Sequence, residues 1–195
     1  MTGEYRVIRT DERIEAVRSL EMTHKMLLEV QHDVYYWKWV VIALHSAIQN
    51  FIVSAISGSN GLGALTDKSA REWIEAYESQ ADAYPEEKLA DFLELYKRMK
   101  KQCGFSPSPR VNKNIRQLHK HFRNNFIHFT PKGWSIIVDG FPQMMMDCLQ
   151  PICFLAWESG SVLWYEENMQ DTAKASYESC MKILISLYHE YTGKS

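Results

Sequence analysis

Arginine, asparagine and histidine stand close together at Arg123, Asn124 and His128. Histidine titrates near neutral pH, so it can take a proton from a hydroxyl group or give one to a leaving oxygen. Arginine can neutralise the charge that builds on phosphate oxygens, and its forked donors match their geometry. These residue types suit the cleavage of RNA by its own 2′-hydroxyl, which needs no metal ion. We expect Arg123 and His128 to be catalytic, with Asn124 orienting one of them.

Spacing alone does not single out this pair. An arginine precedes a histidine at similar spacing in three places: Arg18/His24, Arg116/His121 and Arg123/His128. The third is distinguished by Asn124, which follows the arginine and shares a helix face with His128 four residues later. The structural alternative is that Arg123 pairs with an acid and His128 caps carbonyl groups at a helix end. The lack of nearby acidic residues weakens that alternative.

The segment 95–138 has the most uneven charge distribution in the chain. It contains no Asp or Glu, and it holds ten of the 22 basic residues: Lys97, Arg98, Lys100, Lys101, Arg110, Lys113, Arg116, Lys120, Arg123 and Lys132. Because the whole chain has a net charge of −2, the remainder without these ten carries −12. A basic stripe on an acidic body favours a polyanionic partner. We expect RNA, held by Arg116, Lys120, His121 and Asn125.

Two other histidine patterns could suggest a metal site. Glu-x-x-His occurs at Glu21/His24 and at Glu29/His32, but both copies lie on one predicted helix, whereas di-iron bundles need two helices. The alternating pair His119 and His121 would point about 200° apart on a helix and could not share a metal ion. Contact with phosphate is the better interpretation, so we expect neither a metal nor a cofactor.

The compartment and solubility of the chain follow from three features. Its four cysteines form no CxxC pair, and the charged first residues do not form a signal peptide, which is typical of a cytoplasmic protein. The apolar segment 34–56 is long enough for a membrane span, but Lys38, His45 and Gln49 fall on one helical stripe. Polar residues cost too much in lipid unless protein buries them. We therefore expect a central helix of a soluble bundle, with no membrane contact.

Helices must position the motif, because apolar residues recur at helical spacing along most of the chain. The sequence predicts helices at 10–31, 34–56, from 67 or 69 through 77, from Pro85 through 96, from about 111 to 128, 142–157 and 168–191, with Pro151 kinking or splitting the sixth. The short β-branched stretch 134–138 predicts a strand. The expected fold is a single all-α domain over 1–195, a helical bundle with one short β-strand or hairpin after the motif helix.

The motif also carries a resemblance. Arg123-Asn124-x-x-x-His128, followed by Phe129 at a predicted helix end, resembles the signature of the HEPN superfamily (higher eukaryotes and prokaryotes nucleotide-binding). That signature is an arginine, a polar residue and then a histidine after four to six intervening residues. The continuation FIHFTPKGWSI is similar to a bacterial, plasmid-associated branch. The detailed likeness covers about 118–137.

The resemblance implies a HEPN-like bundle that forms a homodimer, with two motifs facing one cleft. It also implies a metal-independent endoribonuclease, as in toxins, phage-defence proteins and RNA-processing enzymes. Some members bind RNA or nucleotides without cutting them, which gives the first alternative. The second alternative is a partner-binding bundle, one half of a toxin–antitoxin pair, whose motif docks an antitoxin or regulatory protein.

Overall fold

The computed structural model describes residues 5–131 and 133–193, and these residues are mostly helical. The α-helices are α1 (Glu12–Val30), α2 (Trp37–Ile56), α3 (Asp67–Glu78), α4 (Phe92–Cys103), α5 (Pro109–Gln117), α6 (Asn124–Ile127), α7 (Phe141–Cys153) and α8 (Glu167–Thr192). Two 3₁₀ turns, η1 (Val34–Tyr36) and η2 (Leu62–Ala64), and two π-helical turns, η3 (Leu118–Arg123) and η4 (Phe154–Glu158), complete them. The predicted all-α class is confirmed.

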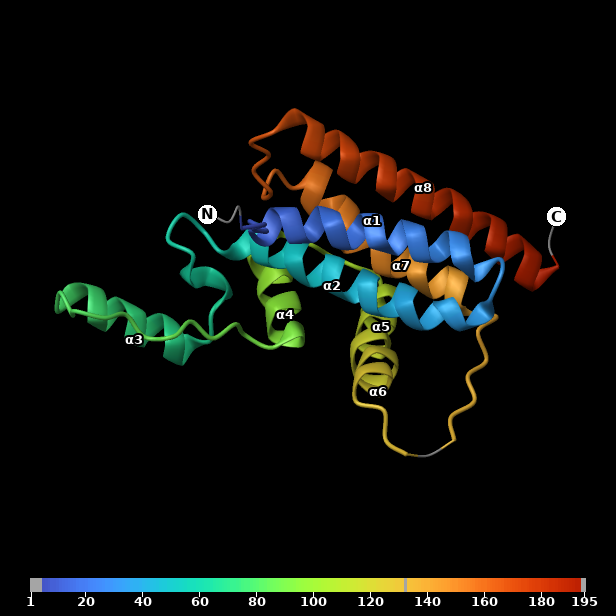
Figure 1. Cartoon of the computed structure of the whole chain (residues 1–195), viewed down its shortest axis with the longest axis horizontal. Helices are drawn as coiled ribbons and strands as arrows, with labels where there is room; N and C mark the ends of the chain where they lie inside the picture. Colours follow the sequence, from blue (N-terminus) through green and yellow to red (C-terminus); the bar gives the residue numbers. More distant parts are fainter. Residues whose placement is uncertain (1–4, 132, 194–195) are drawn as a thin grey trace.

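The body of the molecule is a bundle of four long helices. Helices α1 and α2 run antiparallel, α8 lies along α1, and α7 packs against α2 and α8 (Figure 1). Leu44, Ala47 and Ile48 of α2 are fully buried at the centre of the core. Helix α2 with η1 is also the one stretch of the described residues that could cross a membrane by length and composition, and its most apolar window is 56% buried in the protein. The prediction of a central core helix is confirmed.

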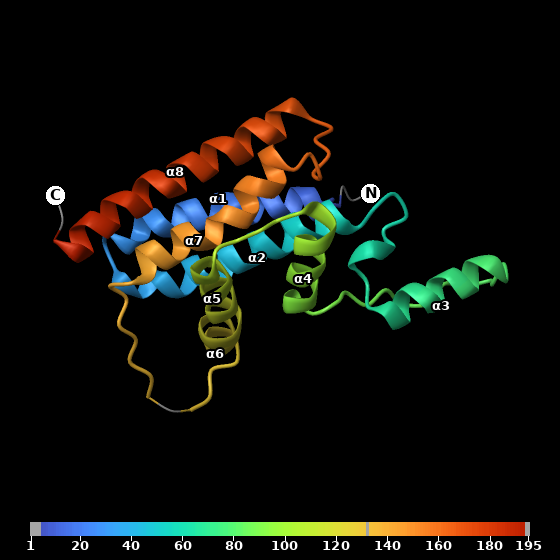
Figure 2. The same cartoon turned by 180° about the vertical axis from the view of Figure 1, so that it is seen from behind.

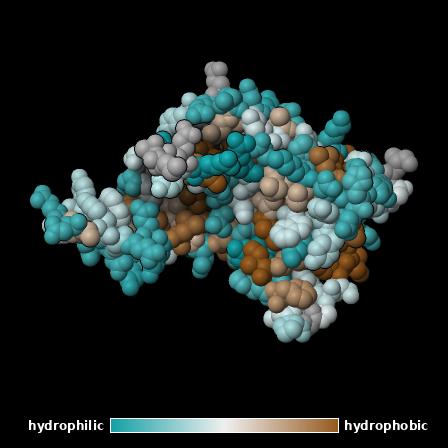
Figure 3. Space-filling view, viewed as in Figure 1, coloured by the Kyte–Doolittle hydropathy of each residue, from teal (hydrophilic) through white to brown (hydrophobic). Residues whose placement is uncertain are grey.

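Two projections leave the bundle. Helices α5, η3 and α6 form one continuous helical limb beneath α2, and α3 extends as a separate arm on the far side of α4 (Figure 2). The arm is mostly hydrophilic, whereas hydrophobic surface gathers around the limb and the neighbouring part of the bundle (Figure 3). The limb is the expected motif helix, and Ser108 caps its start by accepting a hydrogen bond from Val111 N–H.

The predicted helix from Pro85 through 96 is confirmed only in its second part, because α4 begins at Phe92 and the segment before Phe92 is extended. Its backbone bonds to the turn before α3: Thr66 N–H donates to Lys88 O, and Ala90 N–H donates to Ala64 O. These bonds hold the segment in the extended form that an isolated bridge at Leu89 also requires. Pairing with a distant segment has overridden the local preference for a helix.

The predicted strand after the motif helix is also wrong. Residues 134–138 lie in the loop from α6 to α7, and among the described residues no segment pairs with them. A strand needs a neighbour for its backbone N–H and C=O groups, whatever the β propensity of its side chains. Trp134 instead packs on Phe122 and Phe126 of the limb, while Ile137 is 85% exposed.

The first half of the limb is joined to the bundle through a buried carboxylate. Asp147 of α7 is 1% exposed and accepts hydrogen bonds from Arg110 at 3.0 Å and from Asn114 at 2.7 Å. Gln143 and Gln150 donate to the same carboxylate from α7. A buried charge is tolerated only when it is paired and hydrogen-bonded, so Arg110 is committed to the fold.

Replacing Arg110 with alanine removes the cation of this group and should lower the free energy of unfolding by about 1–3 kcal/mol. The loss stays below that of a fully buried pair because Arg110 is largely exposed and three amides still contact Asp147. Urea unfolding measures it. Arg116→Ala, an exposed arginine of the same limb, is the matched control and should change stability little. Equal losses in both variants would contradict the assignment.

Candidate functional site

The three motif residues lie where the limb changes its helical form. Arg123 is the last residue of the π-helical turn, Asn124 opens α6, and His128 caps its end. The backbone N–H of Asn124 bonds to His119 O, five residues back, as a π-turn requires. This wider turn brings residues four and five apart onto one face, so His119 shares a face with Arg123 and Asn124. Such turns are frequent at functional sites.

The Arg123 guanidinium is not neutralised by an acid. Its Nη1 donates to Asn124 Oδ1 at 3.0 Å, and among the described residues no carboxylate lies within ion-pair distance of it. The amide of Asn124 thus contacts the arginine, not the histidine of the motif. An arginine held by a neutral amide keeps its full charge for an anionic ligand.

His128 stands apart from the other two motif residues within one chain. Its backbone N–H bonds to Asn124 O at 2.8 Å, and its side chain is exposed at the helix end. Across residues 5–131 and 133–193, no hydrogen bond, ion pair or ring contact of its imidazole is found. Among the described residues, His128 therefore forms no side-chain hydrogen bond with Arg123 or Asn124.

A second pair of histidines was not expected from the sequence. His45 of α2 and His119 of η3 meet with 2.9 Å between His45 Nε2 and His119 Nδ1. Phe92, the first residue of α4, stacks on both rings, with centroids 4.2 Å from His45 and 4.8 Å from His119. Packing between α2, α4 and η3 therefore fixes the positions of the two imidazole rings. The available signal was His45 itself, a polar residue inside a core helix that needs a buried partner.

Both histidines of this pair are held in the neutral form. Burial, followed by the charges of His119 and Arg123, lowers the pKa of His45 to about 3. Burial also lowers the pKa of His119, as do Arg123 and Lys120, while Asp91 raises it. In a neutral pair one ring donates and the other accepts, so the 2.9 Å contact is a hydrogen bond whose direction is set by the tautomers of the two rings.

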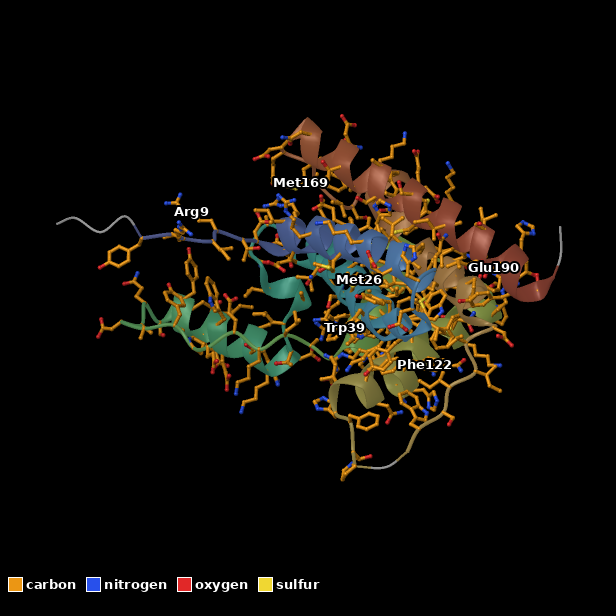
Figure 4. All side chains as sticks on the ribbon, turned by 45° about the vertical axis from the view of Figure 1, so that its right-hand side comes forward. Arg9, Met26, Trp39, Phe122, Met169 and Glu190 are labelled. Atoms are coloured by element: carbon orange, nitrogen blue, oxygen red, sulfur yellow. The ribbon has the colours of Figure 1, made fainter. Side chains whose placement is uncertain are left out.

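The residues expected to hold RNA lie on the same limb. Arg116, Lys120 and His121 are exposed, and Asn125 Nδ2 donates to His121 O at 2.6 Å. The His121 ring stands edge-on to Trp134, and a small pocket of about 100 Å³ is lined by His121, Asn125, Phe129, Thr130 and Trp134. Phe122 anchors this face of the limb in the core (Figure 4).

The basic stripe is only partly available to a ligand. Lys97 and Arg98 pair with Glu94, Arg98 also reaches Asp67, and Arg110 pairs with Asp147. Lys132 lies outside the described residues. Six basic side chains have no ion pair within the part of the chain that the structure describes: Lys100, Lys101, Lys113, Arg116, Lys120 and Arg123. Within the stripe, the unpaired positive charges therefore lie on α4 and the limb.

Other features of the molecule do not compete with this site. Within the described residues, no group of three or more His, Cys, Asp or Glu side chains lies together in a way that could hold a metal ion. A hollow of about 790 Å³ opens near the C-terminal end of α2, lined in part by Glu12, Ser54 and Tyr165, and it contains none of the motif residues.

No protein-family model, no curated protein and no solved structure matches the chain. The function of the site must therefore be inferred from its own residues and their geometry.

The low pKa of His45 makes stability depend on pH. As the pH falls from 6.5 toward 3, His45 binds a proton in the unfolded chain but stays unprotonated in the folded chain. The free energy of unfolding therefore decreases. The stabilisation that neutral His45 contributes is fully present above about pH 6.5. About 2 kcal/mol of it is lost by pH 5. Between pH 7 and pH 5 the wild type should therefore lose about 2 kcal/mol more than His45→Gln.

Chemical unfolding at the two pH values measures this difference. His32→Gln, at an exposed position, is the matched control and should behave as the wild type does. Parallel losses in wild type and His45→Gln would show that the buried ring is not kept neutral by the fold.

Proposed function

We propose that the chain is a HEPN-like, metal-independent endoribonuclease that acts in the cytoplasm as a homodimer. The observation that supports this best is Arg123, a guanidinium with no acidic partner among the described residues, held by Asn124 on a π-helical turn. Near it lies His119, a partly exposed imidazole whose pKa is lowered by burial and by the charge of Arg123. Toxin and phage-defence roles are the biological settings that suit such an activity.

The chemistry requires no group beyond these side chains and the RNA. A base removes the 2′-hydroxyl proton, the 2′-oxygen attacks phosphorus, and the bond from phosphorus to the 5′-oxygen breaks. Arg123 stabilises the charge on the phosphorus oxygens, and an acid protonates the leaving 5′-oxygen. The products are a 2′,3′-cyclic phosphate and a 5′-hydroxyl. His128 serves as the acid or base of this reaction.

A second copy of the chain supplies what one copy lacks. His128 is exposed and forms no hydrogen bond with Arg123 in its own chain among the described residues, and two facing limbs would bring a second set of these residues to one cleft. The two neighbours of His128 in the chain are exposed apolar side chains: Ile127 is 44% exposed and Phe129 60%. Such a cluster favours burial against a partner, and the twofold copy is the partner that also completes the site.

The alternative is a module that binds RNA or a nucleotide without cutting it. The separation of His128 from Arg123 within one chain favours this alternative, because binding requires the free positive charge but no proton transfer. An antitoxin or regulatory protein could then occupy the same surface. Cleavage of RNA in the presence of a chelator separates the enzyme from these alternatives.

Replacing Arg123 or His128 should strongly lower the rate of RNA cleavage. Arg123→Ala and His128→Ala should each lower the cleavage rate by about 10²-fold or more with RNA binding little changed, because both act in the transition state. Asn124→Ala should cost less, since Arg123 loses only its orienting bond. The assay is cleavage of mixed RNAs in EDTA by variants whose circular dichroism matches wild type.

Arg18→Ala is the matched control, because Arg18 pairs with Glu21 at 2.8 Å on the exposed face of α1. It should cut RNA at the wild-type rate. If Arg116→Ala abolishes cutting while a folded Arg123→Ala retains it, the catalytic arginine has been wrongly assigned.

RNA affinity should decrease steeply with salt, because Arg116, Lys120 and other free cations of the limb release counterions from phosphates. For single strands each phosphate contact contributes about −0.7 to the slope of log affinity against log salt. Arg116→Ala should make that slope shallower by about this amount, as measured by filter binding at several salt concentrations. A flat affinity between low and physiological salt would indicate a small-ligand pocket instead.

Phe129→Asp should convert a dimer to a monomer and lower cleavage with it, since a charge cannot be buried in the apolar contact. Light scattering at micromolar concentration measures the oligomeric state. Leu163→Asp, at a position 62% exposed and remote from the limb in the sequence, is the control and should remain dimeric. A wild type that is monomeric and fully active would refute the shared cleft.

A further inference from the structure

The His45–His119 pair is built like an acid–base group with a buried support. His45 is 2% exposed, and Phe92 covers both rings, so the orientation of His119 is fixed by packing as well as by the 2.9 Å hydrogen bond. His119 is partly exposed, and within the described residues no hydrogen bond engages its other ring nitrogen, Nε2. The π-helical turn places this ring on the face that carries Arg123 and Asn124.

The direction of the hydrogen bond decides what His119 can do. If His45 donates, His119 carries its own proton on Nε2 and cannot accept another there. If His119 donates from Nδ1 to His45 Nε2, its Nε2 is unprotonated and is a proton acceptor. His45 then also stabilises the imidazolium that forms when His119 takes up a proton, since it accepts the Nδ1–H bond in both states.

We propose that His119 is the general base of the RNA cleavage described above, and that buried His45 is the positioning residue that selects its tautomer. This inference rests on the proposed function. His119 Nε2 takes the proton of the 2′-hydroxyl as the 2′-oxygen bonds to phosphorus. His128 donates a proton to the 5′-oxygen as its bond to phosphorus breaks. The two histidines leave in exchanged protonation states, and solvent restores them.

Two histidines are needed because base and acid must differ in protonation state at the same step. One histidine cannot be protonated and unprotonated at the same time. If His128 were the one catalytic histidine of each chain, His128 of one copy would have to act as the acid and His128 of the other copy as the base. His119 supplies the base from the same turn as Arg123, next to the phosphate that this arginine holds. His128 is then needed only as the acid.

The charges around His119 tune it for this role. Burial lowers the pKa of His119 most, Arg123 and Lys120 on its own limb lower it further, and Asp91 at the start of α4 raises it, while His45 on α2 is neutral. In the free protein His119 is therefore unprotonated at neutral pH. A bound phosphodiester offsets the charge of Arg123, which raises the basicity of His119 when the substrate is in place.

The first test uses NMR of the full chain labelled with ¹⁵N-histidine, with single-stranded DNA as an uncleavable probe. Free His119 should show a protonated Nδ1 and an unprotonated Nε2. Its pKa should increase on binding the DNA, and Arg123→Gln should increase it in the free protein. A protonated Nε2 in the free protein, or a pKa that neither change moves, would overturn the assignment.

The second test compares cleavage rates in EDTA. His119→Gln should lower the rate by about 10²-fold or more with RNA binding retained. His45→Gln, whose amide oxygen can still accept from His119 Nδ1, should keep most of the rate. His45→Leu, which removes the acceptor, should lose it and shift the acid limb of the pH–rate profile. His32→Gln, an exposed histidine outside the site, should cut as wild type does.

The outcomes separate this inference from the proposed function. A wild type that cuts no RNA overturns both. A wild type that cuts at the rate of a folded His119→Gln overturns the base role alone and leaves the endoribonuclease in place. Equal rates for folded His45→Gln and His45→Leu would show that His45 only fills space and would overturn its positioning role.

Discussion

Two buried polar groups of the bundle decide where the limb lies. Asp147 on α7 and His45 on α2 are almost inaccessible to water, and a buried polar group without a partner costs free energy that a small domain cannot spare. Both find partners on the limb: Arg110 and Asn114 bind Asp147, and His119 binds His45. The limb is therefore held at two points along its length as well as by its apolar face.

This arrangement divides the basic residues of the limb into two groups. Arg110 forms an ion pair with the buried carboxylate of Asp147. Arg123 lies beyond His119, the second residue that attaches the limb, and it contacts the neutral amide of Asn124. The π-helical turn between them changes the angular spacing, so that His119 contacts His45 while sharing its outward face with Arg123 and Asn124. The π-helical turn η3 thus carries both His119, which bonds to His45, and Arg123, which has no ion pair among the described residues.

The third motif residue, His128, lies at an exposed position at the end of the limb. His128 caps the end of α6, and the loop that follows carries exposed apolar side chains toward solvent instead of folding them back onto the bundle. Trp134, Ile136 and Val138 of the same loop are partly buried against the core, and Trp134 packs on Phe122 and Phe126. An exposed histidine surrounded by exposed apolar residues suits an interface better than an isolated surface, which is why the proposed function includes a second copy.

Local patterns in the sequence were sufficient for the helices whose signals lie within a few residues. Asp11 caps α1, and the apolar spacing of 34–56 identifies the central helix, whereas the limb begins at Pro109, two residues before the predicted start. The motif residues and the concentration of positive charge were also visible in the sequence. Each of these depends on near neighbours along the chain, where spacing and position coincide.

Only the tertiary structure decided the rest. The extended segment after Pro85 depends on backbone bonds to residues 64–66, and the stretch 134–138 fails to become a strand because no partner reaches it. His45 and His119 are 74 residues apart, and no periodicity links them. Their contact, like the π-turn that accompanies it, arises from how α2, α4 and the limb pack. Side chains that meet through packing leave no local pattern to read.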